Sequence, residues 1–243
     1  MSRRRARCSR VRAWTVRDTG AVRTLRLAPL VAVAALLAAC SEGPQRPDVD
    51  VPERVSAPVA DGVVDAAWLA ETADRTQVPE RVLRAYARAS DRLAARGCEI
   101  GWNTLAGIGR VETSHARFGG AEVSEAGDVR PRILGPRLDG GPGIRAIEDT
   151  DGGELDGDTT WDRAVGPMQF IPTTWERWGA DGDGDGRRDP HSIDDATLAA
   201  ARYLCDAGDG MSDDDGWVEA VLTYNNSGAY ARKVADAARE YAG

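Results

Sequence analysis

The stretch Gly-Ile-Gly-Arg-Val-Glu-Thr-Ser-His, residues 107–115, places one carboxylate, Glu112, at the end of an apolar run. A second stretch, Ala-Val-Gly-Pro-Met-Gln-Phe-Ile-Pro-Thr-Thr-Trp, covers residues 164–175 and carries Gln169 between apolar residues. A repeating Asp-Gly sequence follows at residues 181–186. Together these features predict one acid/base carboxylate, a polar cleft wall around Gln169 and a cation-binding loop beside them.

The residues around these stretches have mainly helical periodicity. Pro79 and Glu80 begin a helix with apolar residues at helical spacing, and Gly97 ends it. Further helices are expected over residues 63–72, 102–114, 172–178, 217–224 and 229–241, and one capped by Asp194 or Asp195 that ends at Ala207. Because no stretch alternates for long at the period of a strand, the sequence predicts a mainly α fold.

Two departures from helical regularity are informative. Gly107 and Gly109 lie inside an expected helix, where each costs ~1 kcal/mol relative to Ala. Their use is either close helix packing or close approach of the backbone to a ligand. Residues 119–160 are rich in Gly, Pro and Asp and show no period, which predicts a long irregular loop that is functional or disordered.

The charge of the chain is unevenly distributed. The formal net charge is −8, but residues 1–39 hold nine Arg and one acid, so the remainder has 22 basic and 38 acidic residues, or −16. An acidic body of this kind lacks the basic footprint that nucleic-acid binding requires. With two His and one Lys, a His-rich metal centre or a Lys nucleophile is also disfavoured.

The N-terminal segment predicts export. Arg-rich residues 2–26 precede an apolar run from Leu27 to Ala39, which is short for a membrane span and fits a signal peptide over residues 1–39. The sequence Leu-Ala-Ala-Cys ending at Cys40 resembles a bacterial lipoprotein cleavage site, in which the Cys is lipidated. Ordinary secretion with cleavage after Ala39 is the alternative. Residues 40–61, rich in Pro, are expected to form the lipidated Cys and an extended tether.

Cysteine usage agrees with export. Cys8 lies in the leader and Cys40 would be acylated, which leaves Cys98 and Cys205 as a pair in the exported body. This predicts a disulfide that ties the end of one helix to another helix across a long loop. Two buried free thiols are the alternative.

Glu112 is the candidate acid/base group, because burial against Ile108 and Val111 would raise its pKa. A solvent-facing Glu on an amphipathic helix is the alternative, and periodicity alone favours it. Gln169 and Asn225 offer both donors and acceptors, which suits sugar hydroxyl and acetamido groups. Three aromatic residues are candidates either for stacking on sugars or for the core: Phe170, Trp175 and Trp178.

The order of four motifs makes a family resemblance specific. Val-Glu-Thr-Ser-His-Ala-Arg-Phe-Gly, Gly-Pro-Met-Gln-Phe-Ile-Pro-Thr-Thr-Trp, the acidic loop and Tyr-Asn-Asn-Ser are similar to those of the membrane-bound lytic transglycosylases of the B type, in the lysozyme-like superfamily. The resemblance implies a lysozyme-like catalytic domain over residues 62–243. It also implies an activity, which is cleavage of the β-1,4 bond between N-acetylmuramic acid and N-acetylglucosamine in peptidoglycan.

In this family a single Glu, here Glu112, protonates the glycosidic oxygen and then acts as base. The muramyl 6-hydroxyl attacks its own anomeric carbon and gives a 1,6-anhydro product, so the second carboxylate of an ordinary glycosidase is not needed. The resemblance implies that substrate is contacted by Gln169, Met168, Tyr224, Asn225 and Ser114. It also implies a monomeric enzyme with glycan strands as partners, on the outer face of the cytoplasmic membrane if Cys40 is lipidated, or secreted.

Two other functions stay open at this point. One is a hydrolytic muramidase, in which an Asp of the 119–160 loop supplies a second carboxylate; the candidates are Asp149, Asp151, Asp156 and Asp158. The other is a peptidoglycan-binding module without turnover, against which the presence of Glu112 argues. Whether His115 contacts substrate is a further open question.

The Asp-Gly repeat resembles the first half of an EF-hand loop, with acids at alternate positions and Gly186 at the sixth. The twelfth position holds Ser192 instead of Glu, and Asp195 matches the late acidic ligand of the transglycosylase loop. We expect a structural Ca²⁺ held by Asp181, Asp183, Asp185, the Arg187 carbonyl and Asp195, with Asp189 as a further candidate through water. A solvated acidic turn is the alternative.

Overall fold

A computed structural model describes residues 46–243 of the chain. The predicted signal peptide and Cys40 lie outside these residues and stay predictions. Within the described part, no helix has both the length and the apolar character needed to cross a bilayer.

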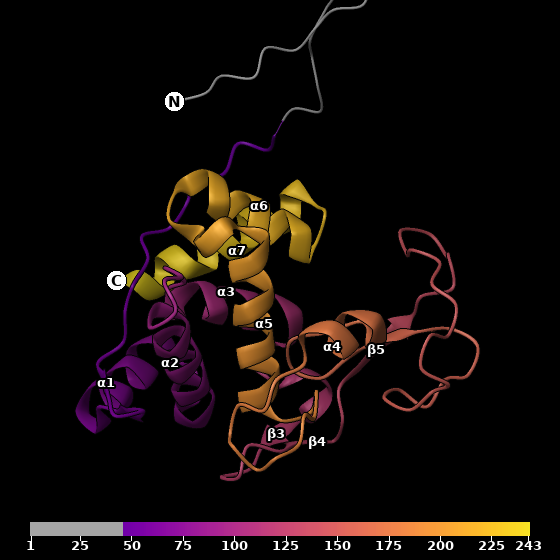
Figure 1. Cartoon of the computed structure of the whole chain (residues 1–243), viewed down its shortest axis with the longest axis horizontal. Helices are drawn as coiled ribbons and strands as arrows, with labels where there is room; N and C mark the ends of the chain where they lie inside the picture. The colour runs from indigo at the N-terminus through magenta and orange to yellow at the C-terminus, as the bar shows by residue number, and fades with distance from the viewer. Residues whose placement is uncertain (1–45) are drawn as a thin grey trace, which may run out of the picture. The chain divides into compact units, whose positions relative to one another are not determined.

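The described residues fold mainly into α-helices, as predicted (Figure 1). The bounds are α1 Ala66–Thr76, α2 Glu80–Ala94, α3 Trp102–Thr113, α4 Pro172–Trp178, α5 Ile193–Ala207, α6 Asp214–Tyr224 and α7 Gly228–Ala242, with 3-10 turns η1 Phe118–Gly120 and η2 Asp209–Met211. Each expected helix is present, with ends that differ by a few residues.

Helix α5 runs through the middle of the helical body, between α2 on one side and α6 on another (Figure 1). The expectation that Asp194 or Asp195 caps it is wrong, because the Ser192 side chain accepts the Asp195 N–H and both acids lie in the first turn. Acids in this position are favourable because they face the positive end of the helix dipole. The small buried residues Ala196, Ala199 and Ala200 let the neighbouring helices approach closely.

Helices α3 and α7 pack along each other more extensively than any other pair of described elements. Gly107 makes this possible: a Cβ at this position would lie 2.8 Å from the backbone oxygen of Val234 on α7. A Cβ on Gly109 would overlap the hydroxyl oxygen of Tyr86 on α2. The two glycines therefore serve close packing of α3, which was one of their two predicted uses.

The predicted disulfide joins Cys98, just after α2, to Cys205 near the end of α5. Gly97, with φ +83°, makes the turn that leads from α2 into Cys98. The bond thus connects two helices that already pack against each other.

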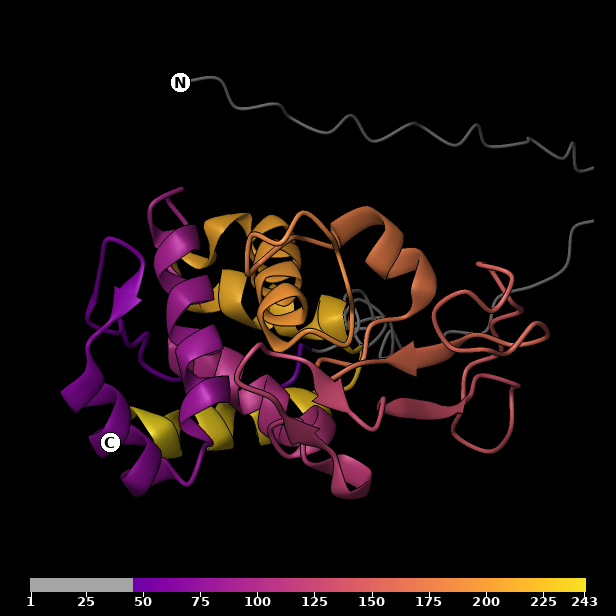
Figure 2. The same cartoon turned by 90° about the horizontal axis from the view of Figure 1, so that it is seen from below.

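Residues 119–165 contain short strands that the sequence analysis did not predict. The strands pair antiparallel as β3 Glu122–Val123 with β4 Val129–Arg130 and β5 Leu134–Arg137 with β6 Arg163–Val165, while β1 Val59–Ala60 and β2 Val63–Val64 form a separate pair near the start. They are too short to show an alternating pattern. Between β5 and β6, residues 138–162 form a lobe that extends away from the helices in both views (Figures 1 and 2).

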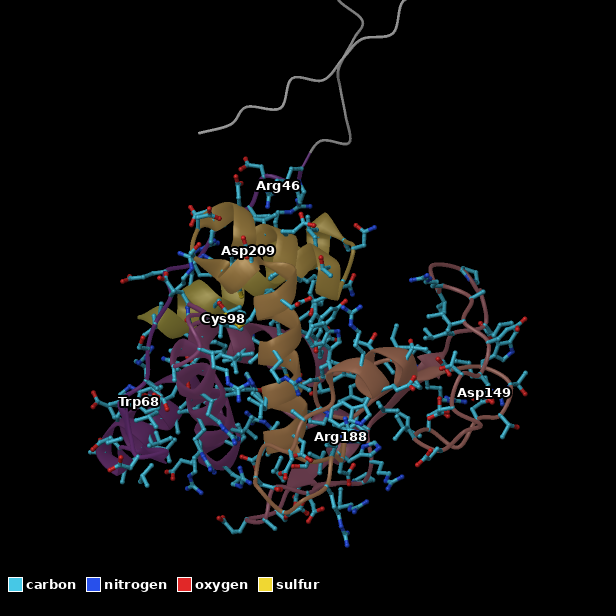
Figure 3. All side chains as sticks on the ribbon, in the orientation of Figure 1. Arg46, Trp68, Cys98, Asp149, Arg188 and Asp209 are labelled. Atoms are coloured by element: carbon cyan, nitrogen blue, oxygen red, sulfur yellow. A yellow bond between two sulfur atoms is a disulfide. The ribbon has the colours of Figure 1, made fainter. Side chains whose placement is uncertain are left out.

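The lobe is closed by its own hydrogen bonds. The Leu138 N–H donates to the Asp162 carbonyl at 3.0 Å, and the Asp162 N–H donates to Ile147 at 3.1 Å. Its aspartates bind backbone N–H groups of the same segment, and Figure 3 labels one of them, Asp149, at a distance from the helical body. The segment is therefore a hydrogen-bonded structure of successive turns.

The described chain before β1 lies against the helices. The Trp102 N–H donates to the Val55 carbonyl at 3.1 Å, and the Asn103 side chain bonds both Val55 and Glu53. Residues 53–55 therefore belong to the folded body, although they lie within the predicted tether.

Candidate active site

Glu112 lies in the last turn of α3 and is half-buried. The Tyr230 hydroxyl on α7 donates to Glu112 Oε1 at 2.6 Å. Burial raises the pKa of Glu112 from 4.5 to about 7, and the Tyr230 hydrogen bond opposes part of that rise. A carboxyl group with this pKa is about half protonated at pH 7, which suits a group that must both give and take a proton.

The second motif is bonded directly to the helix that carries Glu112. The Thr113 hydroxyl, next to Glu112, donates to the Pro167 carbonyl at 2.7 Å. The Tyr224 hydroxyl at the end of α6 donates to the Met168 carbonyl at 2.7 Å. Three of the four sequence motifs are thus joined by two side-chain hydrogen bonds to adjacent carbonyls.

Tyr224 also lies within the electrostatic reach of Glu112. Burial raises the pKa of Tyr224 well above 10, and the negative charge of Glu112 raises it further. The phenol therefore stays neutral throughout the physiological range and keeps its hydrogen bond to the Met168 carbonyl.

Gln169 occupies a left-handed turn with φ +52° between β6 and α4. Its side-chain amide donates to the Gly166 carbonyl at 2.9 Å, and its Oε1 lies against Gly135 of β5, where a Cβ would be 3.0 Å away. The amide is thus held beside β5, the strand that leads into the lobe.

The remaining predicted substrate contacts differ in accessibility. Ser114 and Asn225 are exposed, whereas Met168 is fully buried and contributes its carbonyl to the Tyr224 contact. Met168 is thus part of the support of the site. Phe170 and Trp175 are buried and pack edge to face with centroids 5.4 Å apart, which identifies them as core residues. Trp178 is half-buried and stacks on Tyr203.

Tyr230 is the site residue that the sequence analysis missed. It lies six residues after Tyr224, and it shares the buried face of α7 with Val234 and Tyr241 at helical spacing. That periodicity indicates a core position for Tyr230. The partner of its hydroxyl group follows only from the packing of α7 against α3.

The acidic loop after α4 brings together three of its predicted ligands. Carboxylate oxygens of Asp181, Asp183 and Asp195 all lie within 4.8 Å of one another. Asp185 is outside this group and accepts the Arg187 N–H. Three hard oxygen donors at this spacing fit a Ca²⁺ ion.

Burial raises the pKa of Asp195 to about 6, and the charge of Asp183 contributes to this rise. Asp195 is also bonded to the loop, because it accepts the N–H groups of Gly182 and Asp189. The carboxylate therefore connects α5 to both ends of the acidic loop.

The comparison with known families gives a match over part of the described chain. Residues 144–222 match the model of the family described as the transglycosylase SLT domain. This segment is therefore similar to a transglycosylase SLT domain. The predicted resemblance to the transglycosylases is confirmed by this match.

The SLT domain match includes Met168, Gln169 and the acidic loop, while Glu112, Tyr224 and Tyr230 lie outside the matched range. A search of curated proteins found no significant match.

Two crystal structures of SltB3 from Pseudomonas aeruginosa are similar to this chain. One is a complex with NAG-anhNAM-pentapeptide, with 20% identity and a TM-score of 0.42, and the other a complex with NAG-NAM-pentapeptide, with 21% and 0.43. Each alignment covers 73% of this chain and 66% of the SltB3 chain, so the chain spans just under two thirds of the length of SltB3.

Proposed function

We propose that the protein is a lytic transglycosylase that cleaves peptidoglycan between N-acetylmuramic acid and N-acetylglucosamine and leaves 1,6-anhydromuramyl ends. The observation that carries the proposal is the carboxyl group of Glu112, half-buried, with its pKa raised to about 7 and with a phenol donor at 2.6 Å. The SLT domain match supports the substrate class.

The reaction needs one group to give and then regain a proton. Glu112 donates its proton to the glycosidic oxygen as the bond from the muramyl anomeric carbon to that oxygen breaks. The resulting carboxylate then takes the proton of the muramyl 6-hydroxyl as that oxygen bonds to the anomeric carbon. Tyr230 stabilises the carboxylate between these two steps by a charge-assisted hydrogen bond, and the cycle ends with Glu112 protonated again.

The hydrolytic alternative needs a second carboxylate to activate water. All four candidate aspartates are engaged within the lobe or with the strands that flank it. Asp149 and Asp151 accept backbone N–H groups of residues 151–155, Asp156 accepts the Arg163 N–H of β6, and Asp158 pairs with Arg137 of β5. Carboxylates used in this way hold the turns of the lobe together. This favours the intramolecular attack over attack by an activated water.

We also propose that Ca²⁺ binds the acidic loop through Asp181, Asp183 and Asp195, with the Arg187 carbonyl and Asp185 as the other predicted ligands. The ion would neutralise the clustered carboxylates and fix the segment between α4 and α5. Its role is structural, because the ligands belong to the loop and Glu112 carries the proton transfers.

Digestion of purified peptidoglycan followed by mass spectrometry of the products tests the proposal. We expect anhydromuramyl ends, and we expect Glu112→Gln to abolish release while the variant still sediments with peptidoglycan. Reducing muramyl ends would instead support the hydrolase, and binding without release by the wild type would support the binding module. Unchanged release by Glu112→Gln would contradict the assignment of the acid.

A further inference from the structure

The backbone immediately after Glu112 adopts an uncommon conformation. Ser114, His115 and Ala116 all have positive φ, at +52°, +61° and +61°. Such angles are unfavourable for residues with a side chain, and a run of three requires support from the surroundings. The support in the backbone comes from the last turn of α3, because His115 N–H donates to the Gly109 carbonyl at 2.9 Å.

The side chain of His115 supplies the rest of the support. It is 5% exposed and bonds two tyrosines on different helices. Nδ1 lies 3.2 Å from the Tyr86 hydroxyl on α2, and Nε2 lies 2.8 Å from the Tyr241 hydroxyl on α7. In the neutral ring one nitrogen donates and the other accepts, so both contacts are hydrogen bonds at once.

Gly109 leaves room for one of these partners because it has no side chain. The Tyr86 hydroxyl occupies the space that a Cβ of Gly109 would fill, so α3 is open where the tyrosine reaches His115. Tyr86 itself is completely buried. The His115 contact with α2 is therefore built into the packing of α3.

The contact with Tyr241 concerns Glu112 directly, because α7 carries both Tyr241 and Tyr230. The two tyrosines are eleven residues apart, about 16 Å along a helix at 1.5 Å per residue. The end of α3 thus holds α7 at two separated points, through Glu112 at one and through His115 at the other. Two separated points fix the rotation and the sliding of a helix, which one contact does not.

We propose that His115 is a positioning residue that fixes the Glu112 carboxyl group by clamping the end of α3 between Tyr86 and Tyr241. This inference rests on the proposed function for its catalytic consequence. His115 acts through the helices, because its burial and its two tyrosine partners leave it no contact with a glycan. This answers the question that the sequence left open for this residue.

Burial and the charges around His115 keep its ring neutral, which is the form that makes both hydrogen bonds. Burial lowers its pKa to about 3, and the positive charges of Arg117 and Arg110 lower it further. The groups that face Glu112 are the phenols of Tyr230 and Tyr224. His115 therefore stays neutral where Glu112 titrates, and its effect on Glu112 is one of geometry and hydration.

The test measures the titration of Glu112 directly. Carbon-13 NMR of Glu-labelled protein follows the carboxyl groups with pH, and Glu112→Gln identifies the signal of residue 112. We expect His115→Leu, which removes both hydrogen bonds, to lower the pKa of Glu112 from about 7 toward 4.5, because water enters beside the carboxyl group and burial is the largest cause of the raised value. His115→Gln retains a polar group near the Nε2 position and is expected to restore most of the shift.

Kinetics on soluble glycan strands give the second readout. We expect His115→Leu to lower kcat roughly 10- to 100-fold, the range for a small misplacement of a catalytic group, with little change in KM. The alkaline limb of the pH profile should move to lower pH with the NMR value. Tyr241→Phe removes one oxygen atom and leaves the ring packing, so it tests the same contact if His115→Leu folds poorly.

The control for general destabilisation is Leu69→Ala, a core substitution on α1 that contacts α2. It should lower the melting temperature and leave the Glu112 titration where it is. An unchanged or raised Glu112 pKa in both His115→Leu and Tyr241→Phe, or an equal fall in Leu69→Ala, would overturn the positioning role. Absence of glycan release by the wild type would refute the proposed function alone, since the NMR measurement needs no turnover.

Discussion

The raised pKa of Glu112 has a thermodynamic cost for the folded protein. The folded state binds a proton on Glu112 up to a pH of about 7, whereas an unfolded Glu releases it near 4.5. Stability therefore falls as pH rises through this window, and above pH 7 the folded protein bears the full cost of an ionised, half-buried carboxylate. A shift of this size corresponds to up to about 3 kcal/mol.

This predicts that Glu112→Gln stabilises the protein at alkaline pH. The neutral amide removes the cost of ionisation, so we expect a higher melting temperature than the wild type at pH 8. The gain should shrink as pH falls from 7 to 4.5, where the wild-type carboxyl group is protonated in both states. Thermal unfolding followed by circular dichroism across this range measures it, and a gain that does not vary with pH would contradict the raised pKa.

At this scale the sequence predicts the chemistry of single residues better than their partners. Glu112 and Gln169 are identified by their motifs, because the motifs are contiguous in the chain. The partner of Glu112 is Tyr230, 118 residues away, and the partner of Tyr224 is a backbone carbonyl. Contacts of this kind depend on how helices are placed, which local sequence patterns do not determine.

The stability of the acidic loop is expected to depend on the divalent cations in the solution. Asp181, Asp183 and Asp195 repel one another when ionised, and their only compensation among the described residues is hydrogen bonding to backbone N–H groups of the loop. A divalent cation bound between the three carboxylates would replace their repulsion with attraction to the ion. The proposed Ca²⁺ would therefore stabilise α4 and α5 through the loop that joins them.

We predict that Ca²⁺ raises the melting temperature and that a chelator lowers it. At one hundred times the dissociation constant the ion contributes about 2.7 kcal/mol, and each kcal/mol corresponds to roughly 2–4 °C in a domain of this size. Asp183→Asn should abolish the response, whereas Asp206→Asn, the same change on the exposed face of α5, should keep it. An equal response in both variants would place the ion elsewhere.

Elements are predicted well where periodicity is long and poorly where it is short. The helices appear because their apolar residues recur over several turns, as in α2 and α7. Ser192 rather than an Asp caps α5, because Ser and Asp are about equally good caps and the sequence offers both. Strands β3 to β6 have two to four residues each, too few for alternation to be seen.

At the scale of the whole molecule, the disulfide joins parts of the chain that are 107 residues apart. The segment that it closes includes α3, the lobe, the acidic loop and most of α5. Loss of the bond would give the unfolded chain much greater freedom across this segment, with little change to the α2 and α5 contacts in the folded state. The sequence predicted the pairing correctly because two cysteines remain beyond the predicted leader and the predicted lipidation site.

We predict that reduction, or the double substitution Cys98→Ala and Cys205→Ala, lowers the free energy of unfolding by about 2–4 kcal/mol. Urea unfolding with and without reductant measures the difference. The double variant is its own control, because it should be insensitive to reductant. A wild type that unfolds at the same urea concentration in both conditions would contradict the stabilising role.

The lobe begins and ends at one place, where the Leu138 N–H meets the Asp162 carbonyl. A segment with adjoining ends can be replaced by a short turn, or by a segment from another protein, while the strands on either side keep their pairing. The helices that hold Glu112 would not need to change in such an exchange. The lobe can thus be exchanged as a unit, whereas the helices around Glu112 must be kept together.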